Sequence, residues 1–328
     1  MEEIILYLLE LLIFPGIIFI STLALFFQWF DRKIHARFQN RVGPLVVGPK
    51  GLLQPLADFI KLLSKEDITP ISADRTGFIL APIITLTLAV ISAFFIPVMS
   101  YSGILSFSGD VIVVLFFSTI LTFMIAFAGY SATNRFSTIG AARTALQFIS
   151  YEIPYILSVI AVVIISRSLQ ISEIVASQVS TYGLPYVVIL PIAFVLYLVS
   201  LLAKLEKIPF DIPEAETEIV GGWSAEYSGK KLAFFKLAID IKMVVGAGLA
   251  VAFFLGGPYG PVIPGIEWLC YTFWFIVKTL VLVFILSNLR TLFARYRIDQ
   301  MVKIFWDYIT PLAFLQLILA EGFVIYLM

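Results

Sequence analysis

Long runs of apolar residues, separated by shorter polar stretches, make up most of this chain. A helix needs about 20 apolar residues to cross the hydrocarbon core of a bilayer, and the runs are of that order. They are continuous, whereas the strands of a membrane barrel alternate apolar and polar residues in short segments. The pattern predicts an all-α integral membrane protein with eight transmembrane helices in a single membrane domain, residues 1–328. The predicted spans are 4–30, 78–101, 111–130, 149–165, 185–203, 232–255, 268–289 and 304–327.

One further apolar segment, residues 52–63, is too short to span a bilayer. Its apolar residues recur at helical spacing, and Gln54, Asp58 and Lys61 fall on the other face. Glycines and prolines at 43–44 and 48–51 mark turns before it. We expect an amphipathic helix that lies at the membrane interface after the first span.

Basic residues are concentrated on alternate connections between the predicted spans. The first, third, fifth and seventh connections, approximately 31–77, 131–148, 204–231 and 290–303, hold eighteen Lys and Arg, and the others hold Arg167 alone. Short loops rich in Lys and Arg stay in the cytoplasm. The pattern therefore places these four loops in the cytoplasm and both termini on the outer side of a multi-pass protein of the cytoplasmic membrane.

Composition supports the membrane assignment and excludes several functions. The chain is 60% hydrophobic and 13% charged, with a mean hydropathy of +1.00, which is too apolar for a soluble fold. One cysteine, Cys270, excludes an iron–sulfur cluster held by this chain alone, and one histidine, His35, does not favour a metal site. No phosphate-binding motif or Ser-His-acid set occurs, so we expect no cofactor, no nucleic-acid partner and no covalent catalysis by this chain alone.

An acidic loop, residues 206–228, interrupts two apolar spans and holds six of the 22 acidic residues. Pro213, with Asp211 two residues before it, predicts the start of a helix. Glu214 and Glu218 would then lie one turn apart, where repulsion and partial burial raise the pKa of a carboxyl group. Such groups can pass protons; the alternative is an ordinary solvated loop.

Other ionisable residues lie within or beside the predicted spans. Glu152 follows Gln147 and Tyr151, which share a helix face, and a carboxylate near the membrane is costly unless it serves a path or a partner. Lys236 and Asp240 are four residues apart, so an ion pair within one helix is the simplest explanation of both. Lys278 has no partner on its own helix, which predicts contact with another subunit, a neighbouring carboxylate or a water-filled cavity.

Several short motifs occur in a characteristic order along nearly the whole chain. They are residues 41–44, 51–58 with Lys61 and 65–66, Gln147 with 149–152, 209–211, 213–216, 226–229, and Arg295 with Arg297, Asp299 and Gln300. Together they resemble the subunit 1 family of respiratory complex I, also called the H-subunit family. The resemblance implies a membrane protein that anchors a peripheral redox arm on its cytoplasmic side and helps couple electron transfer to proton or sodium movement.

The resemblance also implies roles for individual residues. A proton path would pass through the acidic loop to the membrane, and Arg41, Arg295 and Arg297 would face the peripheral arm. With neighbouring charged residues added, the predicted path is Asp211, Glu214, Glu216, Glu218, Glu226, Glu152, Asp240 and Lys236; the predicted docking residues are Arg41, Lys65, Arg143, Arg295, Arg297 and Asp299. Glu218→Gln or Glu226→Gln should then uncouple pumping while the complex stays assembled.

The chain departs from the respiratory pattern at several positions. Leu45 follows Gly43-Pro44, Glu206-Lys207 precedes Pro209, and the acid of residues 237–240 stands at Asp240. These departures favour the branch of archaeal-type membrane-bound hydrogenases, which use ferredoxin. That branch implies hydrogenase-like and iron–sulfur peripheral subunits, with iron–sulfur clusters and a nickel–iron centre, and antiporter-like membrane subunits.

Three alternatives stay open at this point. One is the quinone- or phenazine-site subunit of a respiratory NADH or F420H2 dehydrogenase, or a sulfur-reducing relative. A stand-alone transporter would show two related halves, and none is evident. A passive scaffold would hold the peripheral arm while neighbouring subunits carry all the ions.

Overall fold

The computed structural model of the chain describes residue 7 and residues 9–326, and this part is helical, with no β-strand in it. The start of the first predicted span and the end of the last one lie outside the described residues. Seven helices of the described part are long and apolar enough to cross a membrane. The principal helices are α2 (Ile17–Phe38), α3 (Gln54–Ser64), α4 (Arg75–Ala93), α5 (Asp110–Ser131), α6 (Arg135–Ser166), α9 (Pro191–Lys204), α11 (Gly229–Phe254), α12 (Glu267–Leu292), α13 (Ile298–Ile304) and α14 (Thr310–Tyr326).

The fifth predicted span is shorter than expected. Residues 185–203 form two helices, α8 (Tyr186–Ile189) and α9, which meet at Leu190 and Pro191. Proline has no N–H to donate, so it is tolerated at the first turn of a helix and interrupts one elsewhere. A short helix that the sequence did not predict, α7 (Ile171–Ser180), precedes this pair. The prediction of eight full-length spans is therefore matched by seven long helices and one short apolar helix in the described part of the chain.

Two helices extend well beyond their predicted spans. Helix α6 begins at Arg135, where the Asn134 side chain accepts a hydrogen bond from the Phe136 N–H (3.3 Å). Most of the predicted connection 131–148 is thus helix, with Arg143 and Gln147 on it. The last helical stretch runs from Ile298 through a π-helical turn at Phe305–Ile309 into α14.

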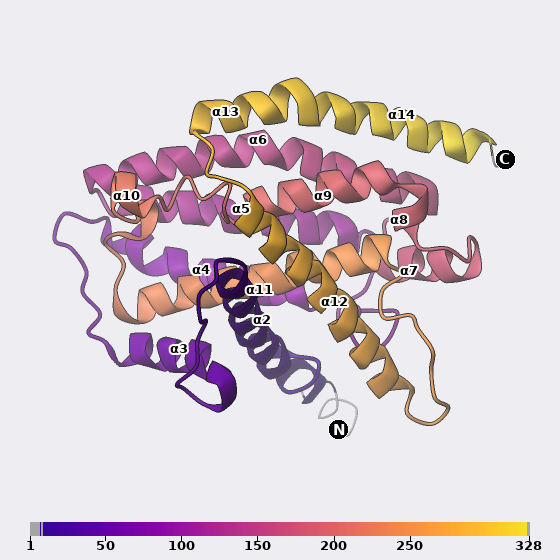
Figure 1. Cartoon of the computed structure of the whole chain (residues 1–328), viewed down its shortest axis with the longest axis horizontal. Coiled ribbons are helices and arrows are strands. Elements are labelled where there is room, and N and C mark those ends of the chain that lie inside the picture. Colours follow the sequence, from indigo (N-terminus) through magenta and orange to yellow (C-terminus); the bar gives the residue numbers. More distant parts are fainter. Residues whose placement is uncertain (1–6, 8, 327–328) are drawn as a thin grey trace.

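The long helices form a bundle with α11 in its interior. Helices α4, α5, α6 and α9 pack around α11 and one another, and α14 lies along α6 (Figure 1). Gly246 permits the close approach of α11 and α9, because a Cβ atom there would lie 2.3 Å from Cδ1 of Leu201. Gly248 similarly faces Ile96. The absence of a side chain at both glycines therefore lets neighbouring segments pack closely against α11.

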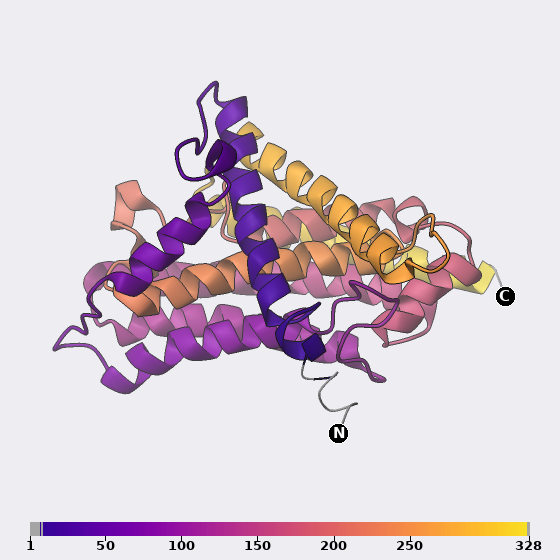
Figure 2. The ribbon, with the colours of Figure 1, turned by 90° about the horizontal axis from the view of Figure 1, so that it is seen from below.

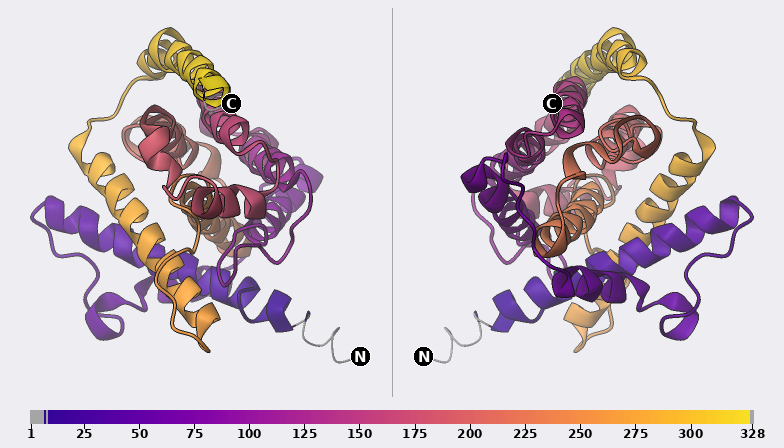
Figure 3. Two further views of the ribbon diagram at one scale, coloured as in Figure 1. Left: turned by 90° about the vertical axis from the view of Figure 1, so that its right-hand side faces the viewer. Right: turned by 90° about the vertical axis from the view of Figure 1, so that its left-hand side faces the viewer.

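Helices α2 and α12 pack against one side of this bundle and cross it obliquely. In end-on views they lie opposite α14 (Figure 3). The segment between α2 and α3 projects beyond the bundle (Figure 2). Helix α3 confirms the predicted amphipathic helix: Leu56 and Ile60 are exposed, and Asp58 accepts a hydrogen bond from Arg32 of α2 (2.7 Å).

Candidate functional site

A charged cavity of about 610 Å³ lies where the acidic loop meets α2, α11 and the end of α12. Helix α2 contributes Gln28, Asp31 and Arg32, and α11 contributes Lys236, Ile239, Asp240 and Met243. The end of α9, the acidic loop, and the end of α12 with the segment after it supply the rest of the lining: Leu205, Glu206, Lys207, Ile208, Asp211, Glu214, Glu216, Thr217, Arg290 and Arg295. The structure therefore brings five of the predicted path residues, Asp211, Glu214, Glu216, Lys236 and Asp240, to a single cavity.

Asp31 ties three elements of the cavity wall together. Its Oδ2 atom accepts hydrogen bonds from Lys207 of the loop (2.9 Å) and from Arg290 of α12 (2.8 Å). Asp31 is 4% exposed, and a buried carboxylate must be paired to persist. Its Oδ1 atom has no hydrogen-bond partner among the described residues. Sequence reasoning missed Asp31, because an acid between Phe30 and Arg32 resembles an ordinary interfacial residue.

The acidic loop does not fold as predicted. A helix does start in it, but at Glu216 rather than Pro213, and it is a single turn, α10 (Glu216–Ile219). Asp211 does not cap that helix; instead it pairs with Arg295. Glu214 therefore does not stand one helical turn from Glu218. It lines the cavity, whereas Glu218 is exposed and pairs with Arg143 (2.7 Å).

The loop is also not a solvated loop, because aromatic side chains fix it to the bundle. Trp223 and Tyr227 are buried, and the Tyr227 ring stacks on the Phe78 ring with 4.1 Å between the ring centroids. Gln147 of α6 donates hydrogen bonds to the carbonyls of Ala203 (2.8 Å) and Phe210 (2.9 Å), which fixes the start of the loop. Glu226 accepts a hydrogen bond from Asn134, ahead of α6. The carboxylates of the acidic loop therefore occupy fixed positions.

The pKa values of the loop carboxyl groups separate according to burial and partner. Burial raises the pKa of Glu214 to about 8, and the nearby Glu206 and Asp211 add to the effect. Burial also raises the pKa of Glu206 and of Asp211, although the hydrogen bond from Arg295 opposes the rise at Asp211. The hydrogen bond from Arg143 lowers the pKa of Glu218. The sequence predicted raised pKa values for carboxyl groups of the loop. The prediction is confirmed for Glu214 and is wrong for Glu218, whose pKa is lowered.

A second cavity of about 370 Å³ adjoins the first between α2, α3 and α11. The two share Gln28, Arg32, Lys236 and Asp240, so these side chains lie at the junction. Lys236 and Asp240 form no ion pair with each other in the described part of the chain, so the simplest explanation of that pair is wrong. The rest of its lining mixes six apolar and three charged residues: Leu25, Pro55, Phe59, Leu62, Leu232 and Leu237, with Asp58, Lys61 and Lys65.

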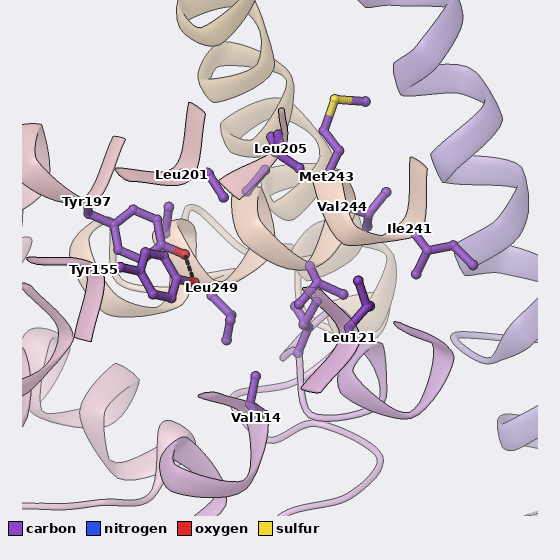
Figure 4. Close-up of a cluster of buried hydrophobic side chains, with 14 of the residues drawn as sticks. Val114, Leu121, Tyr155, Tyr197, Leu201, Leu205, Ile241, Met243, Val244 and Leu249 are labelled. Carbon is purple, nitrogen blue, oxygen red and sulfur yellow. Dashed lines mark hydrogen bonds between the residues drawn. The ribbon is translucent and has the colours of Figure 1, made fainter. Parts of the chain in front are cut away.

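A polar group lies inside the bundle, away from both cavities. Lys204, at the end of α9, donates hydrogen bonds to Glu152 of α6 (3.3 Å to each oxygen) and to Ser118 of α5 (3.0 Å). Beside them the Tyr155 and Tyr197 hydroxyls lie 3.2 Å apart, within an apolar cluster that includes Leu201 and Leu249 (Figure 4). Glu152 was predicted, but Lys204 was counted only as a basic loop residue. The spacing of Tyr151 and Tyr155, four apart beside Glu152, was the available signal.

Backbone carbonyls hold Lys278 of α12. Its ammonium group donates to the carbonyls of Leu255 (2.7 Å), Gly257 (2.9 Å) and Tyr259 (2.8 Å), and it pairs with no carboxylate in the described part of the chain. It thus satisfies the free carbonyls at the end of α11. Among the described residues, no group of three or more His, Cys, Asp and Glu could hold a metal ion.

The predicted docking residues occupy two places on the surface. Arg143, Arg295, Arg297 and Asp299 line one cavity of about 220 Å³ beside the acidic loop. Arg41 is exposed in the projecting segment between α2 and α3, and Lys65 lines the cavity between α2, α3 and α11. A shared docking face for all six residues stays a prediction.

Comparison with known proteins gives a consistent result over nearly the whole chain. The family model described as NADH dehydrogenase matches residues 11–321. The chain is 40% identical over 311 residues to the H subunit of the NADH-quinone oxidoreductase of Thermomicrobium roseum, covering 90% of this chain and 89% of that protein. It is 39% identical over 320 residues to H subunit 1 of the same kind of enzyme in Geobacter metallireducens (94% and 93% covered). It is 36% identical over 312 residues to the H subunit in Dehalococcoides mccartyi (95% and 85% covered).

Proposed function

This chain belongs to the NADH dehydrogenase family that includes the H subunits of NADH-quinone oxidoreductases, and from that premise we propose that its charged cavity receives the headgroup of a membrane quinone. It is the membrane subunit of a complex I-type oxidoreductase. The relatives carry the name of a quinone oxidoreductase, so they fit the respiratory alternative better than the hydrogenase-type branch. Nothing in them supports ferredoxin or a nickel–iron partner.

The observation that carries the proposal is the junction of two cavities whose walls differ in polarity. The inner cavity is lined mostly by charged side chains from α2, the acidic loop and α11, whereas nearly half of the residues that line the outer one are apolar. A quinone has a polar headgroup that accepts protons on reduction and a long apolar tail. A partly apolar passage that ends in a charged chamber suits both parts of such a molecule.

Helix α3 supports a position of the outer cavity near the membrane surface. Amphipathic helices lie in the interface with the apolar side in the lipid, and α3 exposes Leu56 and Ile60 while Asp58 binds Arg32 of α2. The outer cavity lies between α3 and the long helices α2 and α11. A quinone would therefore leave the lipid between these helices without passing through water.

Reduction of the quinone requires two electrons and two protons. The electrons would come from iron–sulfur clusters in peripheral subunits, and the protons from the cavity, where Glu214 holds a proton near neutral pH because its pKa is raised to about 8. Arg297 and Asp299 are exposed, and their charged groups form no ion pair with a residue in the described part of the chain. They are available to a peripheral subunit that docks beside the acidic loop.

The passage predicts a difference between long-tailed and short-tailed quinones. Leu62→Trp would narrow the outer cavity, whereas Leu56→Trp, on the exposed side of the same helix, would not. In the assembled complex, Leu62→Trp should raise the KM for a long-tailed quinone more than the KM for a tail-less analogue, and Leu56→Trp should change neither. Equal effects of Leu62→Trp on both substrates, or none, would refute the passage.

A further inference from the structure

The break between α8 and α9 leaves backbone groups of α9 without partners. Helix α8 ends at Ile189, and α9 begins at Pro191, which has no N–H. The N–H groups of Ile192 and Ala193, in the first turn of α9, form no hydrogen bond with any residue of the described chain. A continuous helix would pair them with the carbonyls of Val188 and Ile189. Within a bilayer no water is present to bind such groups, so each needs another partner.

Hydrogen bonds to other helices fix α8 and therefore the break. Gln178 of α7 accepts hydrogen bonds from the N–H of Tyr186 in α8 (3.2 Å) and from the N–H of Gly256, just after α11 (2.9 Å). Its amide group also donates to the carbonyl of Ala252 in α11 (2.8 Å). The Tyr186 hydroxyl lies 2.8 Å from the hydroxyl of Ser177 in α7. Because α8 is tied to α7 and α11, the free N–H groups of α9 occupy a fixed position.

An amide side chain without a partner lies beside the break. Gln316 of α14 is 2% exposed, and neither its Oε1 nor its Nε2 atom has a hydrogen-bond partner among the described residues. Gln316 lines a cavity of about 220 Å³ together with Leu190, Pro191 and Ile192 at the break. A buried amide without a hydrogen bond is costly. Unpaired polar groups from two helices, α9 and α14, therefore meet at one cavity.

The remaining wall of this cavity is apolar and reaches the surface of the bundle. It consists of Ile165, Ile189, Leu319, Ala320 and Phe323. Leu319 is 55% exposed and Phe323 is 36% exposed, so the cavity opens on the outer side of α14. Large apolar side chains exposed on a membrane helix contact lipid. The occupant of the cavity therefore needs a hydrogen-bond acceptor at one end and an apolar part at the other.

The cavity lies at the end of the bundle opposite the acidic loop. Helix α6 begins at Arg135, beside the loop, and ends at Ser166, one residue after Ile165 of the cavity wall. Phe323 lies three residues before the end of α14. Figure 1 shows α8 and the end of α14 at one end of the bundle and α10 at the other. A cavity this close to the helix ends lies near the edge of the hydrocarbon core, where the ester groups of phospholipids are found.

We propose that this cavity binds a membrane phospholipid, with an ester carbonyl oxygen at the break and part of an acyl chain along the apolar wall. The oxygen accepts hydrogen bonds from the N–H groups of Ile192 and Ala193, where the positive end of the α9 dipole favours an acceptor. The Gln316 amide supplies a further donor to the same group. Water alone fits poorly, because apolar walls hold it weakly. The site is separate from the quinone passage, which lies at the other end of the bundle.

Photo-crosslinking of the intact complex tests this site. The complex is placed in vesicles of phosphatidylethanolamine and phosphatidylglycerol that contain a phospholipid with a diazirine next to its ester group, and the labelled peptides are identified by mass spectrometry. The label should appear at the start of α9 and near Gln316. Leu319→Trp fills the open side of the cavity and should remove most of this label. Leu315→Trp is the control, because Leu315 is 51% exposed on the same helix but does not line the cavity. Equal labelling of both variants, or no label at the cavity of the normal complex, would overturn the proposal.

A second variant tests the polar end of the site. Gln316→Leu keeps the size of the side chain and removes the amide, so labelling at the cavity should fall by roughly three- to tenfold, the effect of one lost hydrogen bond. Labelling of other membrane-facing helices should not change. Undiminished labelling at the cavity in this variant would refute the polar site. An excess of long-tailed quinone should not displace the label; displacement would assign the cavity to quinone instead of phospholipid. Neither result depends on the outcome of Leu62→Trp.

Discussion

The protonation state of Glu214 at neutral pH is the sharpest consequence of the structure. Its carboxyl group lies in the cavity wall beside Glu206 and Asp211, and burial raises its pKa to about 8. At pH 7 such a group is about 90% protonated, whereas a glutamate with the ordinary value of 4.5 is protonated in well under 1% of molecules. We therefore expect a neutral carboxylic acid at a position where the sequence alone suggests a charge.

The same shift fixes how stability depends on pH. Between pH 4.5 and about 8 the folded chain holds a proton on Glu214 that the unfolded chain has released. Stability therefore falls as pH rises through this range, by at most about 5 kcal/mol in total. The loss arises because ionised Glu214 would be desolvated beside Glu206 and Asp211. Glu214→Gln removes the titrating group and should flatten this part of the profile.

Infrared difference spectroscopy can test this expectation on the intact complex. The spectrum of the normal complex minus that of Glu214→Gln should contain the C=O band of a protonated carboxylic acid at pH 7. The band should disappear with a midpoint near pH 8. Glu218→Gln is a matched control, because the pKa of Glu218 is lowered by Arg143 and no such band should be lost. If the Glu214 difference spectrum shows a carboxylate at pH 7, the account of the cavity is wrong.

Two pairs of substitutions test the packing and the ion pairs of the structure. At Gly246 a Cβ atom would already lie 2.3 Å from Leu201, so Gly246→Val should reduce the thermal stability of the complex by about 1 to 3 kcal/mol. Gly322→Val is the control: a Cβ atom there has no neighbour within 4 Å, so this variant should keep the normal thermal stability. Asp31→Asn leaves Lys207 and Arg290 without their shared carboxylate and should cost about 3 kcal/mol, somewhat less than a fully buried pair because Arg290 is partly exposed. Asp58→Asn, at the exposed pair with Arg32, should have a much smaller effect in the same thermal assay. Equal effects of the paired substitutions would contradict both explanations.

The sequence predicted most spans because lipid exposure requires apolar runs, and it predicted α3 because its two faces differ. It could not predict the break at Leu190, since Pro191 also suits the first turn of a helix. The sequence analysis placed Arg143 in a connection because polar residues end an apolar run. Helix α6 nevertheless begins before the apolar segment, at Arg135, and includes Arg143. The hydropathy pattern indicates which residues contact lipid. It does not indicate where a helix extends beyond the membrane into water or against a partner subunit.

The site was predicted from clustering along the chain, and its errors arose from contacts between distant segments. Glu214 and Glu218 looked equivalent by spacing, but Arg143 of α6 and the cavity wall give them opposite environments. Asp211 looked like a helix cap, but Arg295, 84 residues away, binds it. No local pattern contains these partners. Lys204 was similarly misjudged, because its partner Glu152 lies on a different helix.

Helix α11 places its charged residues on different sides. Lys236 and Asp240 line the cavities, where a quinone would meet them, and Lys242, two residues after Asp240, lines neither of them. Two residues correspond to about 200° around a helix, so Lys242 lies on nearly the opposite side from Asp240. The acidic loop shows the same division, because Glu214 lines the charged cavity whereas Glu218 is exposed. The side of the helix or loop on which a charged residue lies, and not its position along the chain, therefore decides whether a substrate in the cavities would meet it.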